Sequence, residues 1–247
     1  MAEAVFLSII IPAYNEAHRI GRTLESIREF LQGKSFASEV IVVDDGSTDE
    51  TAALVERFMH EHPHMAVRLE RNRRNEGKGY SVRRGVLAAR GEIVLFTDAD
   101  LSAPIAEAPK LYEPIAGAMA DVVIGSRALD PHLVTQPVGR RLAGRLFNLC
   151  VRALTGLRFK DTQCGFKAYR REAILPIFRV QRIRGFGFDA EVLYLAHKRG
   201  LRLREVPVRW SHSEGSRVRM MRDAIRMVLN LAETRWNDLT GRYDKAG

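Results

Sequence analysis

Cysteine is scarce in this chain: among its 247 residues only Cys150 and Cys164 are present. Two cysteines without a paired spacing exclude a disulfide-stapled scaffold and a zinc knuckle. Long apolar runs are also absent, and none reaches the roughly 18–20 residues that a helix needs to cross a bilayer. The first residues, MAEAVFLSIIIPAYNE, lack the basic start and the small-residue cleavage site of a secretory signal peptide. We therefore expect a cytoplasmic protein in a reducing compartment.

Lysine is scarce as well, because only 7 of the 39 basic residues are lysine and 32 are arginine. Residues 1–135 contain 15 basic and 20 acidic residues, a net charge of −5. Residues 136–247 contain 24 basic and 10 acidic residues, a net charge of +14. Arginine suits phosphates, because its guanidinium group can donate two parallel hydrogen bonds to phosphate oxygens. The charge therefore indicates a nucleic acid, a nucleotide or an anionic membrane as partner.

The first half of the chain alternates continuous apolar runs with segments of helical periodicity. Such runs are typical of strands that are buried on both faces, and their order predicts an α/β protein with a doubly wound, mainly parallel sheet. Ser47, with Glu50 three residues later, forms a capping-box pattern that predicts the start of a helix. The expected strands cover 5–11, 39–45, 65–70, 91–100 and 121–127, and the expected helices cover 16–32, 46–62 and 78–90.

The second half is predicted to contain fewer strands and more basic helices. The alternating segment 201–210 predicts a strand that is antiparallel or at a sheet edge, since Pro207 cannot donate a hydrogen bond. No linker or low-complexity stretch is visible, so we expect a single domain over 1–247. The other expected elements are basic amphipathic helices at 138–158 and 219–236, a helix at 187–200, and a loop with a short strand at 161–172.

Acidic side chains follow two of the expected strands at the edge where such sheets bind ligands. Asp98 and Asp100 follow one strand, and they can share Mg²⁺ or Mn²⁺ through oxygen ligands. The alternative is a pair of solvated carboxylates. Asp44 and Asp45 follow another strand, where they can accept hydrogen bonds from a base or a ribose hydroxyl. The alternative for this second pair is an Asx turn.

Several motifs, taken in order, resemble those of inverting family-2 glycosyltransferases with the GT-A fold: SIIIPAYNE, VIVVDDGSTDET, NEGKGYSVRRGVLAARGEIVLFTDADLS, VIGSR and DTQCGFKAY. The chain is more similar to the polyprenyl-phosphate and dolichyl-phosphate sugar synthases. Within these, RGFGFDAEVLYLA and VPVRW followed by EGSRV resemble the dolichyl-phosphate β-glucosyltransferases most. The resemblance spans roughly residues 5–220. It implies a GT-A domain with a nucleotide-sugar half (1–126), a smaller acceptor half (127–218) and a C-terminal basic amphipathic helix (219–247).

The resemblance also implies roles for individual residues. In related mannosyl synthases a glutamine two residues after the second aspartate often completes the metal shell, whereas this chain has Ser102 there, so the third protein ligand stays open. Asp98 and Asp100 would hold the metal against the diphosphate, and Arg127, Gln163 and Arg217 would close over the phosphates of donor and acceptor. The implied donor-binding residues are Pro12, Ala13, Tyr14, Glu16, Asp44, Asp45, Lys78, Asp98 and Ala99. The candidate catalytic residues are Asp100, Arg127, Gln163, Asp189 and Arg217, among which Asp189 is a candidate base for a hydroxyl acceptor.

The implied reaction moves glucose from UDP-glucose to a polyprenyl or dolichyl phosphate and inverts the anomeric carbon. A phosphate acceptor is already anionic near neutral pH and requires little help from a base. A donor of the GDP-mannose or UDP-GlcNAc type and a soluble or polysaccharide hydroxyl acceptor are the alternatives. A hydroxyl acceptor would need a carboxylate base, for which Asp189 and Glu191 are candidates unless they are solvated or salt-bridged helix positions.

Two other classes of protein are less favoured by the same residues. A nucleic-acid-binding protein would suit the net charge of +9, but it requires no converging acidic edge, so we expect no nucleic acid partner. A nucleotidyltransferase would need a glycine-rich phosphate loop near the N-terminus, and IPAYNEAHR lacks one.

The two basic amphipathic helices have two interpretations. They can be core helices with charged outer faces, or their arginines can bind anionic lipid headgroups. We favour the second, which predicts peripheral attachment at the inner face of a membrane. The arginines concerned are Arg140, Arg141, Arg145 and Arg152 in the first helix, and Arg219, Arg222 and Arg226 in the second.

Overall fold

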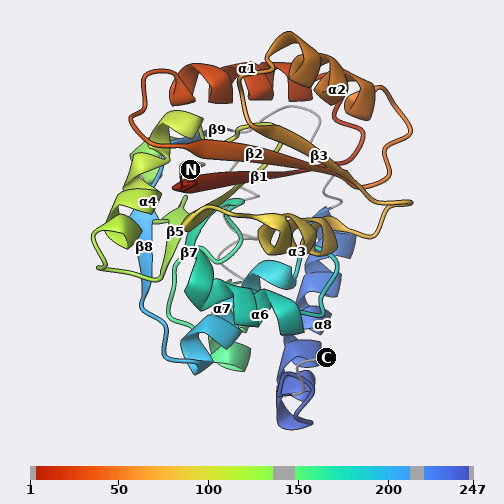
Figure 1. The fold of residues 1–247 in the computed structure, drawn as a ribbon. Helices are drawn as coiled ribbons and strands as arrows, with labels where there is room; N and C mark the ends of the chain where they lie inside the picture. Colours follow the sequence, from red (N-terminus) through yellow and green to blue (C-terminus); the bar gives the residue numbers. More distant parts are fainter. Residues whose placement is uncertain (1–3, 136–147, 212–219, 245–247) are drawn as a thin grey trace.

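The structure, a computed structural model, describes residues 4–135, 148–211 and 220–244, with only the backbone for Pro131 and 220–225. A seven-stranded sheet lies at its centre, with the strand order β3-β2-β1-β4-β7-β5-β8 (Figure 1). The strands are β1 (Leu7–Ala13), β2 (Ser38–Asp44), β3 (Val67–Arg71), β4 (Ile93–Thr97), β5 (Val122–Ser126), β7 (Phe166–Arg170) and β8 (Leu203–Pro207). A second, two-stranded parallel sheet consists of β6 (Val134–Thr135) and β9 (Trp210–Ser211).

Helices cover both faces of the large sheet, which gives the molecule three layers (Figure 1). One face carries α1, α2 and α4, and the other carries α3, α6 and α7. The helices are α1 (Ile20–Leu31), α2 (Thr51–Glu61), α3 (Lys78–Ala88), α4 (Pro109–Ala116), α6 (Arg171–Val180), α7 (Phe188–Lys198) and α8 (Met220–Leu239), with a further helix at 148–155 and 3₁₀ turns at Ile105–Glu107 and Pro131–Leu133.

The strand β1 shows why the sequence of a central strand is apolar throughout. Ile9 and Ile11 belong to the core beneath α1, whereas Ile10 belongs to the core beneath α3. Alternate side chains point to opposite faces, and both faces are covered. β1 pairs in parallel with β2 on one side and with β4 on the other. The expected α/β class with a doubly wound, mainly parallel sheet is confirmed.

The direction of the last long strand corrects one of the alternatives drawn from the sequence. β8 lies at the sheet edge, as expected, but it pairs in parallel with β5, so the antiparallel alternative is wrong. The antiparallel strand is β7, which lies between β4 and β5. The helices α6 and α7 carry the chain back after β7, and β8 therefore runs in the direction of β5. The second half of the chain thus completes the sheet that the first half begins.

The start of α2 is a second correction. The capping-box pattern places the start near Ser47, but the helix begins at Thr51, and no side-chain hydrogen bond caps it. Oγ of Ser47 instead accepts a hydrogen bond from the backbone N–H of Asn15, at 2.8 Å. The Ser47 hydroxyl therefore binds the loop after β1 instead of capping the helix that follows it.

Two helices, α4 and α6, were not expected from the sequence. Each contains an internal proline, Pro114 in α4 and Pro176 in α6, and proline favours helix ends and turns. The helices form because one side of each is buried in the core. The helix expected at 138–158 is seen only at 148–155, and 136–147 lie outside the described residues. Within the part of the chain that the structure describes, no helix is both long and apolar enough to cross a membrane.

Asp121, which directly precedes β5, fastens that strand to both of its neighbours. Its carboxylate accepts hydrogen bonds from Nε and Nη2 of Arg202 at 3.0 and 2.9 Å, and it lies 2.7 Å from Nη2 of Arg170. Arg170 ends β7, and Arg202 directly precedes β8. The hydrogen bonds from Arg202 lower the pKa of Asp121 to about 2. One buried carboxylate therefore stabilises the pairing of three strands.

We expect Asp121→Asn to lower the free energy of unfolding by about 2 kcal/mol at neutral pH, since one pKa unit corresponds to about 1.4 kcal/mol. The folded-state pKa lies below the ordinary value of 3.8. The stabilisation is therefore complete above that value and is lost as the pH falls through 2. Urea unfolding over a pH series would measure the difference between the two proteins. A difference that does not narrow in acid, or an equal loss in Glu113→Gln at an exposed position of α4, would contradict this role.

Candidate active site

The loops that follow β1 and β2 are joined by hydrogen bonds at the carboxyl edge of the sheet. Besides its bond to Ser47, Asn15 accepts the N–H of Thr48 at its Oδ1, at 2.7 Å. Asn15 has a φ of 52°, in the left-handed region that asparagine adopts more readily than most residues. Oδ1 of Asp44 accepts the N–H of Ser47, three residues on, at 3.1 Å. An Asx turn would use the N–H two residues on, so Asp44 makes a longer local turn of the same kind. The loops that contain IPAYNE and VDDGS therefore lie side by side at the carboxyl edge of the sheet.

Asp45 is buried and fixes the loop in front of α3. Its carboxylate accepts hydrogen bonds from Nδ2 of Asn72 at 2.7 Å and from the N–H groups of Glu76 and Gly77 at 3.0 and 2.8 Å. The next residue is Lys78, the first of α3. The carboxylate at the end of β2 therefore positions the cation at the start of α3.

Asp98 and Asp100 follow β4, and their side chains are 34% and 22% exposed. Oδ1 of Asp100 accepts the N–H of Ser102 at 2.9 Å, and Oδ2 lies 3.9 Å from Nη1 of Arg19. A Cβ atom at Gly165 would lie 2.0 Å from Oδ2 of Asp98, so only glycine lets the loop before β7 approach this carboxylate.

Two partly exposed carboxylates, one residue apart, offer the oxygen ligands that Mg²⁺ and Mn²⁺ prefer. The residues therefore fit a divalent cation. Among the described residues, no group of three or more acidic, histidine or cysteine side chains could hold a metal ion. The remaining ligands would then come from substrate, water or a hydroxyl such as that of Ser102, which is buried beside the pair.

Lys78 provides the positive charge closest to these carboxylates. Its Nζ lies 2.5 Å from Oδ1 of Asp98 and over the rings of Phe96 and Phe186, at 5.2 and 5.9 Å from their centroids. Burial alone would lower the pKa of Lys78, but the charges of Asp98 and Asp189 outweigh it and raise the pKa. The ammonium group therefore stays charged at the edge where the acidic residues converge.

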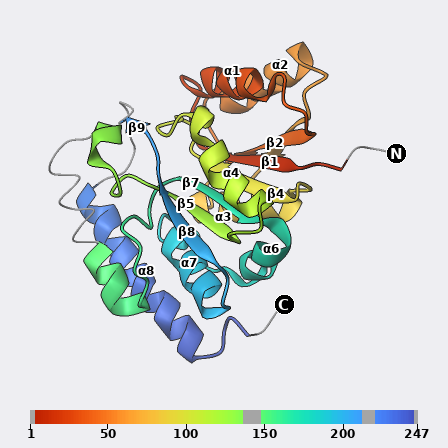
Figure 2. The same ribbon diagram turned by 90° about the vertical axis from the view of Figure 1, so that its left-hand side faces the viewer.

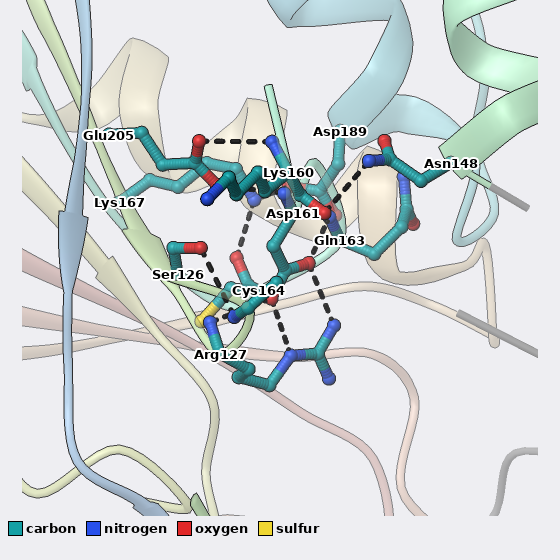
Figure 3. Close-up of polar contacts among 11 residues, drawn as sticks. Ser126, Arg127, Asn148, Lys160, Asp161, Gln163, Cys164, Lys167, Asp189 and Glu205 are labelled. Atoms are coloured by element: carbon teal, nitrogen blue, oxygen red, sulfur yellow. Dashed lines mark hydrogen bonds and ion pairs between the residues drawn. The ribbon is translucent and has the colours of Figure 1, made fainter. Parts of the chain in front are cut away.

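A second polar cluster adjoins the first and centres on Asp161 (Figure 3). Its carboxylate binds the guanidinium of Arg127 through two hydrogen bonds, from Nε at 2.6 Å and from Nη2 at 2.9 Å. Burial opposes the ionisation of Asp161, but Arg127 outweighs it and lowers the pKa of Asp161. Glu205 of β8 accepts the N–H groups of Lys160 and Asp161 at 2.9 and 2.8 Å. Glu205 therefore holds the loop that holds Arg127.

Three buried polar atoms beside this loop have no hydrogen-bond partner among the described residues: Nε2 of Gln163, Oδ1 of Asn148 and Oγ1 of Thr162. The backbone of Gln163 is fixed, since its N–H donates to Oδ1 of Asp161 at 3.1 Å. Buried polar groups in proteins are almost always satisfied. These atoms therefore offer hydrogen bonds to a ligand or to water.

Asp189 forms a buried ion pair with Lys167, whose Nζ lies 2.6 Å from Oδ1 of Asp189 and donates to the carbonyl of Cys164 at 2.5 Å (Figure 3). Burial raises the pKa of Asp189, and the charges of Lys167 and Lys78 only partly offset this. The salt-bridged alternative for Asp189 is correct and the solvated one is wrong. The pair supports the loop that carries Gln163.

Glu191 lies apart from this cluster and is fully buried. Its carboxylate accepts the N–H groups of Arg182 and Ile183, both at 2.9 Å, and the hydroxyl of Tyr243 at 2.7 Å. All three contacts brace the segment before α7 and the end of the chain. Glu191 therefore has a structural role, and the interpretation as a solvated position is wrong for it too.

The structure brings most of the expected residues to one place. Pro12 and Ala13 end β1, and Tyr14 and Glu16 follow in the same loop as Asn15. The side chain of Ala99 is buried, and its carbonyl accepts a hydrogen bond from Oγ1 of Thr23 at 2.6 Å. Arg217 lies outside the described residues.

Sequence reasoning missed Asp161, Lys167 and Glu205. Lys167 carried a signal, since a lysine within the apolar stretch GFKAY requires a buried partner. The other two carried none, because their roles depend on contacts between distant parts of the chain.

Comparison with known proteins identifies the family. Residues 8–178 match the sequence model of the family described as Glycosyl transferase family 2. The dolichyl-phosphate beta-glucosyltransferase of Dictyostelium discoideum is 35% identical, over 96% of this chain and 76% of its own length. The protein of the same name from Saccharomyces cerevisiae is 36% identical, over 98% of this chain and 77% of its own length.

Solved structures share the fold at lower identity. Glucosyl-3-phosphoglycerate synthase from Mycobacterium tuberculosis, in complex with Mn²⁺, UDP-glucose and glycerol 3-phosphate, has a TM-score of 0.66 at 21% identity, over 94% of this chain and 80% of that one. A further mycobacterial protein has a TM-score of 0.69 at 23% identity, over 97% and 75%. The fold is therefore GT-A, as the resemblance implied. The chain belongs to glycosyl transferase family 2, as a nucleotide-sugar-dependent glycosyltransferase of the dolichyl-phosphate sugar synthase type.

Proposed function

We propose that the protein transfers glucose from UDP-glucose to dolichyl phosphate or another polyprenyl phosphate, with a divalent metal and with inversion of the anomeric carbon. The observation that carries the proposal is the setting of Asp98, which contacts Lys78 directly and whose charge also acts on Arg127. Carboxylates, which can bind a metal ion, and cationic side chains, which can bind a diphosphate, lie together at the carboxyl edge of the large sheet. The names of the curated relatives support the sugar and the acceptor. The synthase complex with Mn²⁺ and UDP-glucose supports the donor and the metal.

The donor would bind along residues 1–126. Pro12, Ala13, Tyr14 and Glu16 would line one side of the nucleotide, next to the loop of Asp44 and Asp45. Asp45 already accepts three hydrogen bonds, and a carboxylate has about four acceptor positions. One position therefore stays available for a base or ribose donor.

Asp98 and Asp100 would hold Mg²⁺ or Mn²⁺. Such an ion supplies positive charge that neutralises the leaving diphosphate. Lys78 adds a second positive charge beside the same carboxylate. Oδ1 of Asp100 is kept in place by the N–H of Ser102, so Oδ2, which lies 3.9 Å from Nη1 of Arg19, can face the ligand.

The acceptor would bind along residues 127–218. Asp161 engages Nε and Nη2 of Arg127, which orients the guanidinium and leaves Nη1 for a phosphate oxygen. Nε2 of Gln163 is a further donor without a partner in the described chain. A phosphate acceptor is anionic near neutral pH, so these residues need only hold it in line with the anomeric carbon.

The alternative, a sugar hydroxyl acceptor, requires Asp189 or Glu191 as a base. The carboxylate of Glu191 is held away from the cluster by the N–H groups of Arg182 and Ile183 and by the hydroxyl of Tyr243. Asp189 is buried behind Lys167 and Cys164, where it supports the loop rather than opening to solvent. This favours the phosphate acceptor. Arg217 would act on the same phosphate, as the resemblance implies.

The outer face of α8 supports peripheral attachment to an anionic membrane. Leu229, Trp236 and Leu239 are 63%, 61% and 74% exposed, and their spacing of seven and three residues places them on one side of the helix. Arg226 is exposed on the same helix. Figure 2 shows α8 along the outside of the molecule. An apolar stripe with adjacent arginine is typical of a helix that lies in the membrane interface. We propose the cytoplasmic, inner face as its location.

The metal role predicts that Asp100→Asn lowers kcat/KM by roughly 100-fold or more, because one ligand charge is lost where leaving-group charge develops. Excess chelator should abolish transfer, and Mn²⁺ or Mg²⁺ should restore it. Release of UDP from UDP-glucose with dolichyl phosphate would measure both effects. Asp130→Asn, at a partly exposed position, is the control, and its thermal unfolding should match that of Asp100→Asn. Full activity in excess chelator would contradict the metal role.

The membrane role predicts that Leu229→Gln, Trp236→Gln and Leu239→Gln together weaken binding to anionic liposomes at least tenfold, since burying each apolar side chain contributes about 1.5–3 kcal/mol. Cosedimentation would measure binding, and affinity for UDP should stay unchanged. The control combines Leu87→Gln and Met119→Gln, which alter exposed apolar side chains elsewhere. Wild-type binding should also fall with salt, because exposed charges are screened. If the triple variant binds liposomes as tightly as the wild type, this face is not the membrane surface.

A further inference from the structure

Five arginines surround a pocket of about 570 Å³ beside α3 and the end of α6. Tyr80 and Gln181 complete the polar part of the lining, and the five arginines are Arg83, Arg179, Arg182, Arg184 and Arg242. No acidic side chain of the described residues lines this arginine pocket. None of its residues belongs to the expected donor or acceptor sets.

Two of the five guanidinium groups are held in place by the protein. Arg83 donates to the carbonyls of Phe178 and Arg179 at 2.8 and 2.9 Å, at the end of α6. Arg184 forms an ion pair with Glu76 and lies 5.3 Å from the centroid of the Tyr80 ring. These two arginines therefore have fixed positions before any ligand binds.

The other three have no carboxylate partner within the described residues. Arg182 donates to the carbonyl of Arg242 at 3.3 Å, Arg242 donates to Oδ1 of Asn237 at 3.0 Å, and all three side chains are exposed. Elsewhere in the molecule, clustered arginines share an acid, as Arg170 and Arg202 share Asp121. Among the described residues, Glu76 pairs with Arg184 from outside the lining, and the other arginines of the pocket share no such acid.

Like charges in a concave surface repel one another, and the repulsion is relieved when an anion enters. Guanidinium groups match phosphate oxygens in geometry, because each can donate two parallel hydrogen bonds. The fixed Arg83 and Arg184 reduce the ordering that a ligand must impose. The volume lies within the range of small-molecule sites.

We propose that the arginine pocket is a second phosphate-binding site, separate from the donor and acceptor residues. Its ligand carries a phosphate monoester or a diphosphate, either on a free small molecule or on the headgroup of an anionic lipid. The site adjoins the active edge through one segment. Phe186 covers Lys78, while Arg182 and Arg184 of the same segment line the pocket. The N–H of Tyr80 donates to the carbonyl of Arg184 at 3.2 Å, which ties this segment to the first turn of α3.

Calorimetry with inorganic phosphate tests the site in the full-length protein. Divalent metal is left out, so that no metal ion holds phosphate at Asp98 and Asp100, and any phosphate bound at the donor and acceptor residues is common to the wild type and the pocket variants. The wild type should bind phosphate saturably, and Arg179→Gln with Arg182→Gln should weaken binding at least tenfold. Arg57→Gln with Arg199→Gln removes two exposed arginines that have no ion pair in the described chain, and it should stay within twofold of the wild type. Arg242→Gln alone is a second variant, and unchanged UDP affinity shows that each variant is folded.

A liposome arm identifies the source of the phosphate. Vesicles of phosphatidylcholine with phosphatidic acid present a phosphate monoester on a lipid. If the pocket binds a headgroup, the double variant should bind the vesicles several-fold more weakly than the wild type, with the remaining binding due to α8, and free phosphate should compete with the vesicles in the wild type. If it binds a free molecule, vesicle binding should be equal in both proteins while phosphate binding differs. Absence of phosphate binding in the wild type, or equal binding in the wild type and the pocket variants, overturns the proposal.

Discussion

At the carboxyl end of β4, the carboxylate of Asp98 lies 2.5 Å from the ammonium group of Lys78 and directly against the backbone of Gly165. The rest of the site depends on this contact, because Lys78 of the nucleotide-sugar half and Gly165 of the acceptor half both lie against the carboxylate of Asp98. Nearby cations offset the cost of removing this carboxylate from water. Lys78 is placed by the loop that Asp45 holds, and the loop of Gly165 is placed by Lys167 and Asp189.

The acidic and basic side chains on the acceptor side are paired in the same way. Asp161 neutralises Arg127 and is itself positioned by Glu205, so an edge strand determines where a guanidinium points. Each of these buried ions is paired, as the cost of burying charge requires. Near the site, the buried atoms Nε2 of Gln163, Oδ1 of Asn148 and Oγ1 of Thr162 have no hydrogen-bond partner among the described residues. Away from the site, three arginines of the arginine pocket have no carboxylate partner in the same part of the chain. The ligands that we propose for these two places would complete their interactions.

Much of the first half could be predicted from the sequence, because apolar runs and helical periodicity are local signals. The acidic residues at the ends of β2 and β4 followed from strand order alone. The insertion of β7 between β4 and β5 could not be predicted, since it depends on pairing between distant segments. The partners of Asp189 and Arg127 were hidden for the same reason. The capping-box pattern at Ser47 predicted the wrong start for α2, because the Ser47 hydroxyl accepts a hydrogen bond from Asn15 in the neighbouring loop.

The most direct test of the account identifies the product. The protein would be incubated with Mn²⁺, dolichyl phosphate and either UDP-glucose or GDP-mannose, and the lipid fraction would be analysed by mass spectrometry and proton NMR. The account predicts a glucosyl phosphate lipid from UDP-glucose alone, with the β configuration that inversion of an α-linked donor gives. An α-linked product, faster transfer from GDP-mannose, or glucose recovered only on a soluble hydroxyl acceptor would contradict it.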